Sequence, residues 1–159
     1  MMLNNGIAHP SMLACNYHLF MVSIIAWNVR GAGKSIKSAH LHRLLKSKKA
    51  DMVVLSETKC STISYPLIRR IWGMGNFNFV ASNALNAASG ILVSWDQQTF
   101  VQTSSVVHDH WVAVQGSFIS ESFACVVIGI YNTGEIHLQD VVWSELLSYY
   151  QYNLLHISV

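Results

Sequence analysis

An amide and a carboxylate follow the first two apolar segments of the chain. Asn28 ends an aromatic and β-branched run, Val22 to Trp27, and Glu57 follows a second run, Met52 to Leu55. If the two runs are parallel strands, their carboxyl ends lie at one edge of a sheet and the two side chains meet there. Mg²⁺ prefers oxygen ligands and is usually held by one or two carboxylates with water and substrate phosphate. The pair is therefore a candidate metal site, and the alternative is a turn residue beside a solvated loop carboxylate.

A helix between the two runs would supply the crossover that parallel strands need. Gly31 and Gly33 break the first run, and Ser35 to Lys49 then carries leucines at helical spacing with basic residues on the opposite face. Ser35 is the expected N-cap of this helix. The segment predicts a βαβ unit with a right-handed connection.

The rest of the chain predicts one short helix, a series of strands and a final helix. Pro66 to Trp72 opens with proline and is followed by glycine, as short helices often are. Leu138 to Tyr150 has a stripe of apolar residues at helical spacing, namely Leu138, Val142, Leu146 and Tyr149. Four or five strands lie between these helices, at Phe77 to Ala81, Gly90 to Trp95, Phe100 to Val107, Trp111 to Phe118 and Phe123 to Tyr131. The short polar breaks between the strands favour antiparallel hairpins.

Composition indicates one folded α/β (α+β) domain with little polar cover. Of the 159 residues, 52% are hydrophobic and 11% are charged, whereas about 25% charged residues is usual. We expect a missing partner or a missing piece to cover part of the core. Residues 1–20 have no periodic pattern, so we expect an unstructured or spurious extension, with the domain spanning residues 21–159. The net charge of +2 is too mild to indicate nucleic acid by charge alone.

The sequence also bears on the compartment. No apolar run approaches the roughly 18 residues that a membrane-spanning helix needs. Residues 1–20 contain no Lys or Arg, and polar residues interrupt their apolar stretches, so they do not form a typical signal peptide. Cys15, Cys60 and Cys125 are odd in number and widely spaced. We expect an intracellular protein with reduced thiols that is neither secreted nor held in a membrane, in the nucleus or the cytoplasm.

Three segments carry a resemblance to a known family. They are MVSIIAWNVRG at residues 21–31, ADMVVLSETK at residues 50–59 and SGILVSW at residues 89–95. In combination and order they resemble the endonuclease/exonuclease/phosphatase (DNase I-like) superfamily. More narrowly, they resemble the endonuclease domain of plant LINE-type retrotransposon polyproteins. The resemblance extends from Met21 to about Tyr150.

The resemblance implies a two-sheet sandwich with outer helices, a Mg²⁺ or Mn²⁺ site at one edge and hydrolysis of a phosphodiester bond in nucleic acid. Glu57 would be the metal ligand, and Asn28 would orient the metal or the phosphate. Tyr131 falls where the family has a tyrosine that contacts phosphate, and Asn132 is a weaker candidate.

Two family motifs have no counterpart in this sequence. In the family, an apolar strand ending in Gly-Asp-Phe-Asn follows the last predicted helix, and Ser-Asp-His closes the domain. We therefore expect an incomplete sandwich that corresponds to a truncated N-terminal portion and is catalytically incomplete, so that its status as an enzyme stays open. The alternative is a non-catalytic interaction module that uses an exposed sheet, and the oligomeric state is open.

Three other patterns have competing interpretations. Gly31 to Ser35 matches the end of a P-loop, but Asn28 stands where its first glycine belongs, so a glycine turn is favoured. His108 and His110 could share one face of a strand as metal ligands, but a hairpin turn explains them better. The basic helix is most simply a solvated face, with a weak phosphate-facing role as the alternative. The residues assigned to that face are His40, His42, Arg43, Lys46, Lys48 and Lys49.

Overall fold

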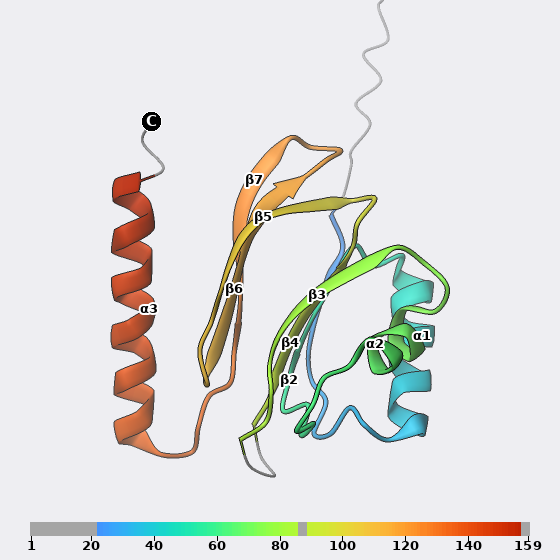
Figure 1. Ribbon diagram of the computed structural model, residues 1–159, viewed down its shortest axis with the longest axis horizontal. Helices are drawn as coiled ribbons and strands as arrows, with labels where there is room; N and C mark the ends of the chain where they lie inside the picture. The colour runs from blue at the N-terminus through green and yellow to red at the C-terminus, as the bar shows by residue number, and fades with distance from the viewer. Residues whose placement is uncertain (1–21, 86–88, 157–159) are drawn as a thin grey trace, which may run out of the picture.

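The computed structural model describes residues 22–85 and 89–156 (Figure 1). Its elements in chain order are β1 (Ile24–Asn28), α1 (Ser35–Lys48), β2 (Met52–Ser56), α2 (Tyr65–Trp72), β3 (Phe77–Ser82), β4 (Ile91–Asp96), β5 (Phe100–Val107), β6 (Trp111–Phe118), β7 (Phe123–Ile130) and α3 (Ile136–His156). Every predicted helix and strand is present, and the largest difference is that α3 continues to His156. The expected extension at residues 1–20 and the start at Met21 lie outside the described residues.

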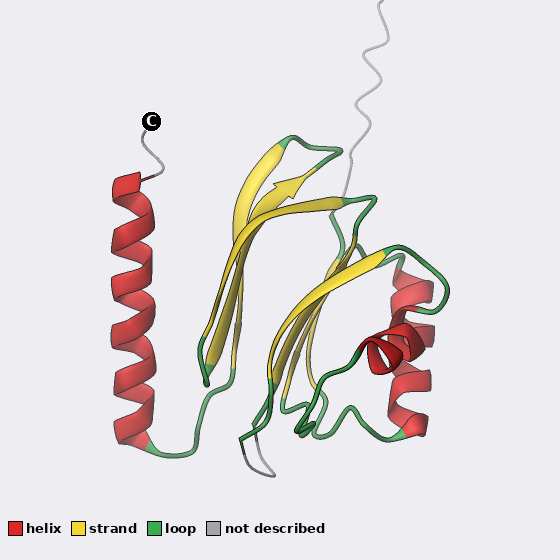
Figure 2. Cartoon of the chain, viewed as in Figure 1, coloured by secondary structure: helices red, strands yellow, loops and turns green. Residues whose placement is uncertain are grey.

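The elements form four layers, helix, sheet, sheet and helix. The first sheet has the order β1-β2-β4-β3 and the second has the order β5-β6-β7. Helices α1 and α2 cover the outer face of the first sheet, and α3 covers the outer face of the second (Figure 2). This arrangement confirms the predicted two-sheet sandwich with outer helices.

Strands β1 and β2 pair in parallel, as the βαβ pattern predicted. Asn28 lies opposite Ser56 in the register, so both strands end at the same edge of the sheet. All other strand pairs are antiparallel. The expected capping role of Ser35 is wrong, because Lys34 occupies the N-cap with no side-chain hydrogen bond and Ser35 is the first helical residue.

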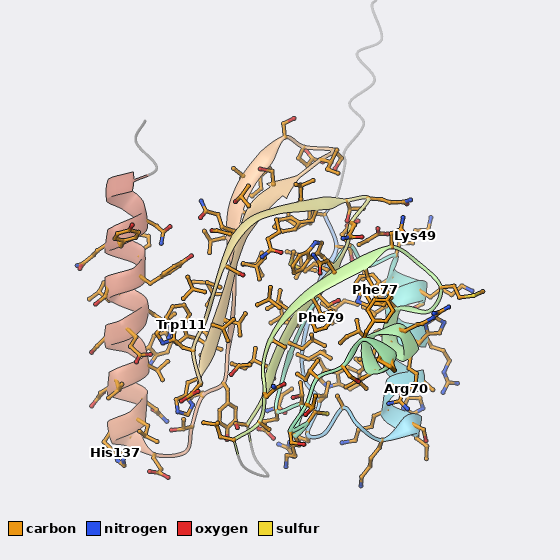
Figure 3. All side chains as sticks on the ribbon, viewed as in Figure 1. Lys49, Arg70, Phe77, Phe79, Trp111 and His137 are labelled. Atoms are coloured by element: carbon orange, nitrogen blue, oxygen red, sulfur yellow. The ribbon has the colours of Figure 1, made fainter. Side chains whose placement is uncertain are left out.

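Three buried clusters lie between the four layers. Strand β4 contributes to two of them, because alternate side chains of a strand point to opposite faces. Leu92 joins the cluster under α1 and α2, whereas Val93 and Trp95 join the cluster between the sheets. Trp111, Val142 and Leu146 belong to the third cluster, under α3, and Figure 3 shows Trp111 between the second sheet and this helix.

A glycine permits a close approach between the two sheets. A Cβ atom at Gly129 would lie 2.9 Å from Cγ2 of Ile91 and 3.0 Å from Cγ1 of Val54. Ile91 pairs with Ser56 at the end of β2. The last residues of β7 therefore lie over the edge where β2 ends.

Helix α3 has apolar side chains on more than its packed face. The predicted stripe is confirmed, because Val142 and Leu146 are buried and Tyr149 packs beside them. Trp143, Leu147 and Tyr150 are exposed on the same helix. Within the described part of the chain, no helix combines the length and the hydropathy needed to cross a membrane.

Candidate metal and phosphate site

The structure brings Asn28 and Glu57 together at the carboxyl edge of the parallel strand pair. Nδ2 of Asn28 donates a hydrogen bond of 2.7 Å to Oε1 of Glu57. Asn28 is the last residue of β1, and Glu57 directly follows β2. The expected meeting of the amide and the carboxylate is confirmed.

The loop that carries Glu57 is held from both sides. Its carbonyl oxygens at Glu57 and Thr58 each accept a hydrogen bond of 2.7 Å, from the amides of Gly31 and Ala32. On the opposite side, the amide of Thr58 donates to the carbonyl oxygen of Gly90 at 3.0 Å, and the amide of Lys59 donates to the carbonyl oxygen of Ser89. Glu57 and Lys59 both have a left-handed backbone, with φ of 52° and 54°, a conformation that costs roughly 1–3 kcal/mol outside glycine. The surrounding hydrogen bonds hold Glu57 in this strained conformation.

The donor set suits one hard divalent ion with Glu57 as its protein ligand. Oε1 of Glu57 accepts from Asn28, and Oδ1 of Asn28 accepts from the amide of Arg30 at 3.3 Å. Oε2 of Glu57 is thus the carboxylate oxygen that the pair leaves for an ion, and the geometry gives Asn28 an orienting position. Among residues 22–85 and 89–156 there is no group of three or more His, Cys, Asp or Glu side chains that could hold a metal. A single carboxylate fits Mg²⁺, which commonly keeps several waters.

Basic side chains surround this edge. A pocket of about 250 Å³ beside Asn28 is also lined by Trp27, Arg30, Lys37 and His40. Nζ of Lys37 donates to the carbonyl oxygens of residues 29 and 30, at 2.9 and 2.6 Å, so this lysine braces the loop after β1. Positive charge at this edge favours a phosphate group, because basic side chains form charge-assisted hydrogen bonds with phosphate oxygens.

Tyr131 lies at the same end of the sandwich. Its amide donates to the carbonyl oxygen of His110 at 2.8 Å, and its ring stacks on the His110 ring with centroids 6.1 Å apart. A groove of about 320 Å³ joins the end of β7 to the site edge, since Ile130 and Asn28 both line it. No hydrogen bond links Tyr131 to Asn28 or Glu57 in the described residues, so its phosphate-contacting role stays a prediction, as does that of the exposed Asn132.

His110 contributes to the site region in a way that sequence reasoning missed. Its Nδ1 atom is buried and has no hydrogen-bond partner among the described residues. The predicted hairpin turn is confirmed, since the amide of His108 donates to the carbonyl oxygen of Trp111 at 2.9 Å. The turn explains why the two histidines are close in sequence, but nothing in the sequence indicates the stacking of His110 on Tyr131.

The structure distinguishes the competing interpretations of two other patterns. The loop from Gly31 to Ser35 agrees with the favoured glycine turn and offers no P-loop cradle, because the amides of Gly31 and Ala32 donate hydrogen bonds to the loop after β2. The placement of His42 on a solvated face is wrong: its Nδ1 lies 3.1 Å from the carbonyl oxygen of Ile71, against α2.

The thiol near the site is not an activated nucleophile. Burial raises the pKa of Cys60, although the nearby backbone amides of Gly33 and Ala32 oppose this shift. Its Sγ donates to the carbonyl oxygen of Thr58 at 3.3 Å. Cys60 and Cys125 are both free and half-buried, while Cys15 lies outside the described residues.

Comparison with solved structures identifies the fold. TDP2 from C. elegans superposes with a TM-score of 0.59 and 13% identity over 86% of this chain and 44% of that chain. The AP endonuclease LMAP from Leishmania major superposes with a TM-score of 0.56 and 16% identity over 77% of this chain and 44% of that chain. The human Nocturnin catalytic domain superposes with a TM-score of 0.52 and 11% identity over 72% of this chain and 51% of that chain. No protein-family model and no curated protein matches the sequence.

These structures share a mixed α/β architecture with two sheets, and the chain has the same fold. The chain spans about half the length of the solved structures it matches. Its fold is therefore the DNase I-like fold that these structures share.

Gly90 provides a test of how the Glu57 loop is held. Its φ of 103° disfavours any side chain, and a Cβ there would collide with Oγ1 of the buried Thr58. Gly90→Ala is expected to lower the free energy of unfolding by about 1–3 kcal/mol in urea denaturation. Gly75→Ala is the matched control, because nothing lies within 4 Å of its added Cβ, and a change within about 0.5 kcal/mol is expected there. Equal, small effects of the two substitutions would contradict the tight packing of this loop.

Proposed function

We propose that the chain carries the N-terminal part of a Mg²⁺- or Mn²⁺-dependent phosphodiesterase site of the DNA-endonuclease type, of retroelement origin. The observation that carries this proposal is the 2.7 Å hydrogen bond between Asn28 and Glu57 at the carboxyl edge of parallel strands. The fold shared with nucleases and phosphodiesterases supports it. The Trp-Asn-Val-Arg-Gly and Glu-Thr-Lys segments support the narrower origin from a plant LINE-type element.

Nucleic acid is the proposed substrate class. A solved structure of TDP2 from D. rerio, similar to this chain with a TM-score of 0.55 and 12% identity over 79% of this chain and 52% of that chain, is complexed with a single-strand DNA product. Arg30 and Lys59 flank the site edge and are exposed, so they are placed to meet a phosphate backbone. The two half-buried free thiols fit a reducing, intracellular compartment.

Each proposed site residue has a distinct task. Glu57 holds the ion through the carboxylate oxygen that Asn28 leaves free. Asn28 fixes the rotation of that carboxylate, and Tyr131 faces the phosphate from the end of β7. A bound divalent ion would polarise the phosphoryl oxygen and lower the pKa of a bound water.

We also propose that these residues alone hydrolyse DNA very weakly. In-line attack on a phosphodiester needs an activated nucleophile, charge stabilisation and assistance to the leaving oxygen. Glu57 and Asn28 serve the second requirement, and the described residues hold no further carboxylate and histidine cluster for the other two. When catalytic groups act as a unit, their contributions to the rate are strongly non-additive. A site that keeps only some of these groups therefore retains little of the catalytic rate of the complete site.

Metal binding through Glu57 is the first prediction of this proposal. MnCl₂ should raise the thermal unfolding midpoint of the chain, since an ion that binds the folded state stabilises it by about 1.4 kcal/mol at tenfold excess over its Kd. Glu57→Gln should abolish this rise. Glu121→Gln, which removes an exposed carboxylate at the β6–β7 turn, is the matched control and should keep it. An equal rise in all three proteins would contradict the assignment of Glu57.

The second prediction concerns activity on DNA. Purified protein incubated with supercoiled plasmid and Mg²⁺ or Mn²⁺ should produce no nicked circles above the metal-free control. Glu57→Gln is assayed in parallel. Nicking by the unaltered chain that disappears in Glu57→Gln would contradict the proposed inactivity while upholding the site, and equal nicking by both would identify a contaminant.

A second candidate function is a non-catalytic interaction module. Strand β1 is an edge of the first sheet and β7 is an edge of the second, and edge strands present unpaired backbone groups that can pair with another strand. Ile24 and Trp27 are 45% and 43% exposed on β1. Ile128 is exposed on β7 and lines the groove between the two edges. These exposed side chains favour pairing of this open side with another β-strand.

A charged substitution on the β1 edge tests this candidate function. If β1 pairs with a strand of a second copy, Ile24→Lys should lower the concentration-dependent association measured by sedimentation velocity. Ile36→Lys is the matched control, because Ile36 is 72% exposed on α1, away from the edge. A chain that stays monomeric at all concentrations, or equal effects of the two substitutions, would count against pairing through β1.

A further inference from the structure

A large pocket lies between α3 and the hairpin end of β5 and β6. Its volume is about 640 Å³, within the range of roughly 300–1,000 Å³ that small-molecule and side-chain pockets occupy. Val106 and Trp111 line it from the sheet, and Asp140, Glu145 and Tyr149 line it from α3. The helix that forms this pocket covers the second sheet, whereas Asn28 and Glu57 belong to the first.

Aromatic rings form much of the pocket wall and are held by one another. The ring of His108 stacks on Trp111 with centroids 4.2 Å apart and an interplanar angle of 14°. Trp111 also contacts Tyr149, at 5.3 Å between centroids. Burial raises the pKa of Tyr149. His108 and Tyr149 cover the Trp111 ring, which is only 1% exposed. Tyr149 and Tyr152 line the pocket with accessible ring surface, and accessible ring faces attract cations through their quadrupoles.

A carboxylate is fixed at the same place. Nε1 of Trp111 donates a hydrogen bond of 2.9 Å to Oε2 of Glu145. Nδ1 of His108 lies 3.8 Å from the same oxygen. Asp140 lies five residues before Glu145 on α3 and lines the pocket with it, so two carboxylates share the rim.

The charge distribution along the chain leaves these carboxylates without Lys or Arg neighbours in their own half of the sequence. All ten Lys and Arg residues fall between Arg30 and Arg70, and residues 71–159 contain none. Six of the eight acidic residues lie in that second part, namely Asp96, Asp109, Glu121, Glu135, Asp140 and Glu145. Figure 3 shows Lys49 and Arg70 beside α1 and α2, across both sheets from Trp111 and α3. The α3 side of the molecule is therefore acidic.

We propose that the pocket under α3 binds an arginine or lysine side chain presented on a polypeptide. The rings of Tyr149 and Tyr152 contribute cation–π attraction, and Asp140 and Glu145 supply the opposite charge. The volume admits the long aliphatic part of such a side chain together with neighbouring backbone. This inference is independent of the metal site and of any activity on DNA.

The test is a titration followed by amide NMR shifts, with Nα-acetyl-arginine methylamide as the probe. Its neutral analogue, Nα-acetyl-citrulline methylamide, has nearly the same shape without the charge. The arginine probe should shift amides of residues 106–111 and 140–149, and the citrulline probe should bind at least about fivefold more weakly. A tetrapeptide containing one arginine should bind more tightly than the single residue, which distinguishes a polypeptide-borne side chain from a free cation.

Matched variants locate the interaction. Asp140→Asn and Glu145→Gln should each weaken binding of the arginine probe about fivefold, and the glutamine oxygen keeps an acceptor for Nε1 of Trp111. Glu121→Gln, an exposed carboxylate far along the chain from α3, should leave binding unchanged. Equal binding of the two probes, or undiminished binding by the double variant Asp140→Asn/Glu145→Gln, would overturn the proposal. Self-association of the chain that is lost in this double variant would support it and identify a second copy as the source of the basic side chain.

Discussion

The parallel pairing of β1 with β2 is the constraint on which the rest of the site depends. Helix α1 returns the chain across the sheet, so both strands end at one edge, and Asn28 reaches Glu57 there at 2.7 Å. The glutamate has a left-handed backbone that isolated chains disfavour. Two sets of hydrogen bonds hold this conformation. The loop after β1 donates one set to the Glu57 loop, and the Glu57 loop donates the other set to the segment before β4. The carboxylate is therefore positioned before any ligand arrives.

The approach of the second sheet extends this edge into a groove. Gly129 lets β7 pass close to Val54 and Ile91, and the strand then delivers Tyr131 to the same end of the sandwich. The layers also separate charge, since the basic residues lie with α1, α2 and their loops while α3 and its surroundings are acidic. A polyanion would thus be repelled from the α3 side and attracted toward the side that carries Asn28 and Glu57.

Much of the fold could be predicted from the sequence because apolar periodicity and glycine breaks are local signals. The runs at β1 and β2, with a helical segment between them, were sufficient to predict the parallel pair and the meeting of Asn28 with Glu57. Features that depend on tertiary contacts could not be predicted in this way. Lys37 turns back to brace the loop after β1, and His42 packs against α2, and neither contact follows from the apolar periodicity of the sequence. The stacking of His110 on Tyr131 likewise exists because these two residues lie next to the last pair of the β6–β7 ladder, Trp111 and Ile130.

The most direct test of the central claim is the position of a bound paramagnetic ion. Mn²⁺ added at substoichiometric concentration should broaden the amide NMR signals of residues 28–31 and 57–59 before those of other segments, and Glu57→Gln should remove this selective broadening. Persistent broadening of the same amides in Glu57→Gln, or broadening centred on Asp140 and Glu145 of α3, would contradict the assignment of the metal site to the edge formed by β1 and β2.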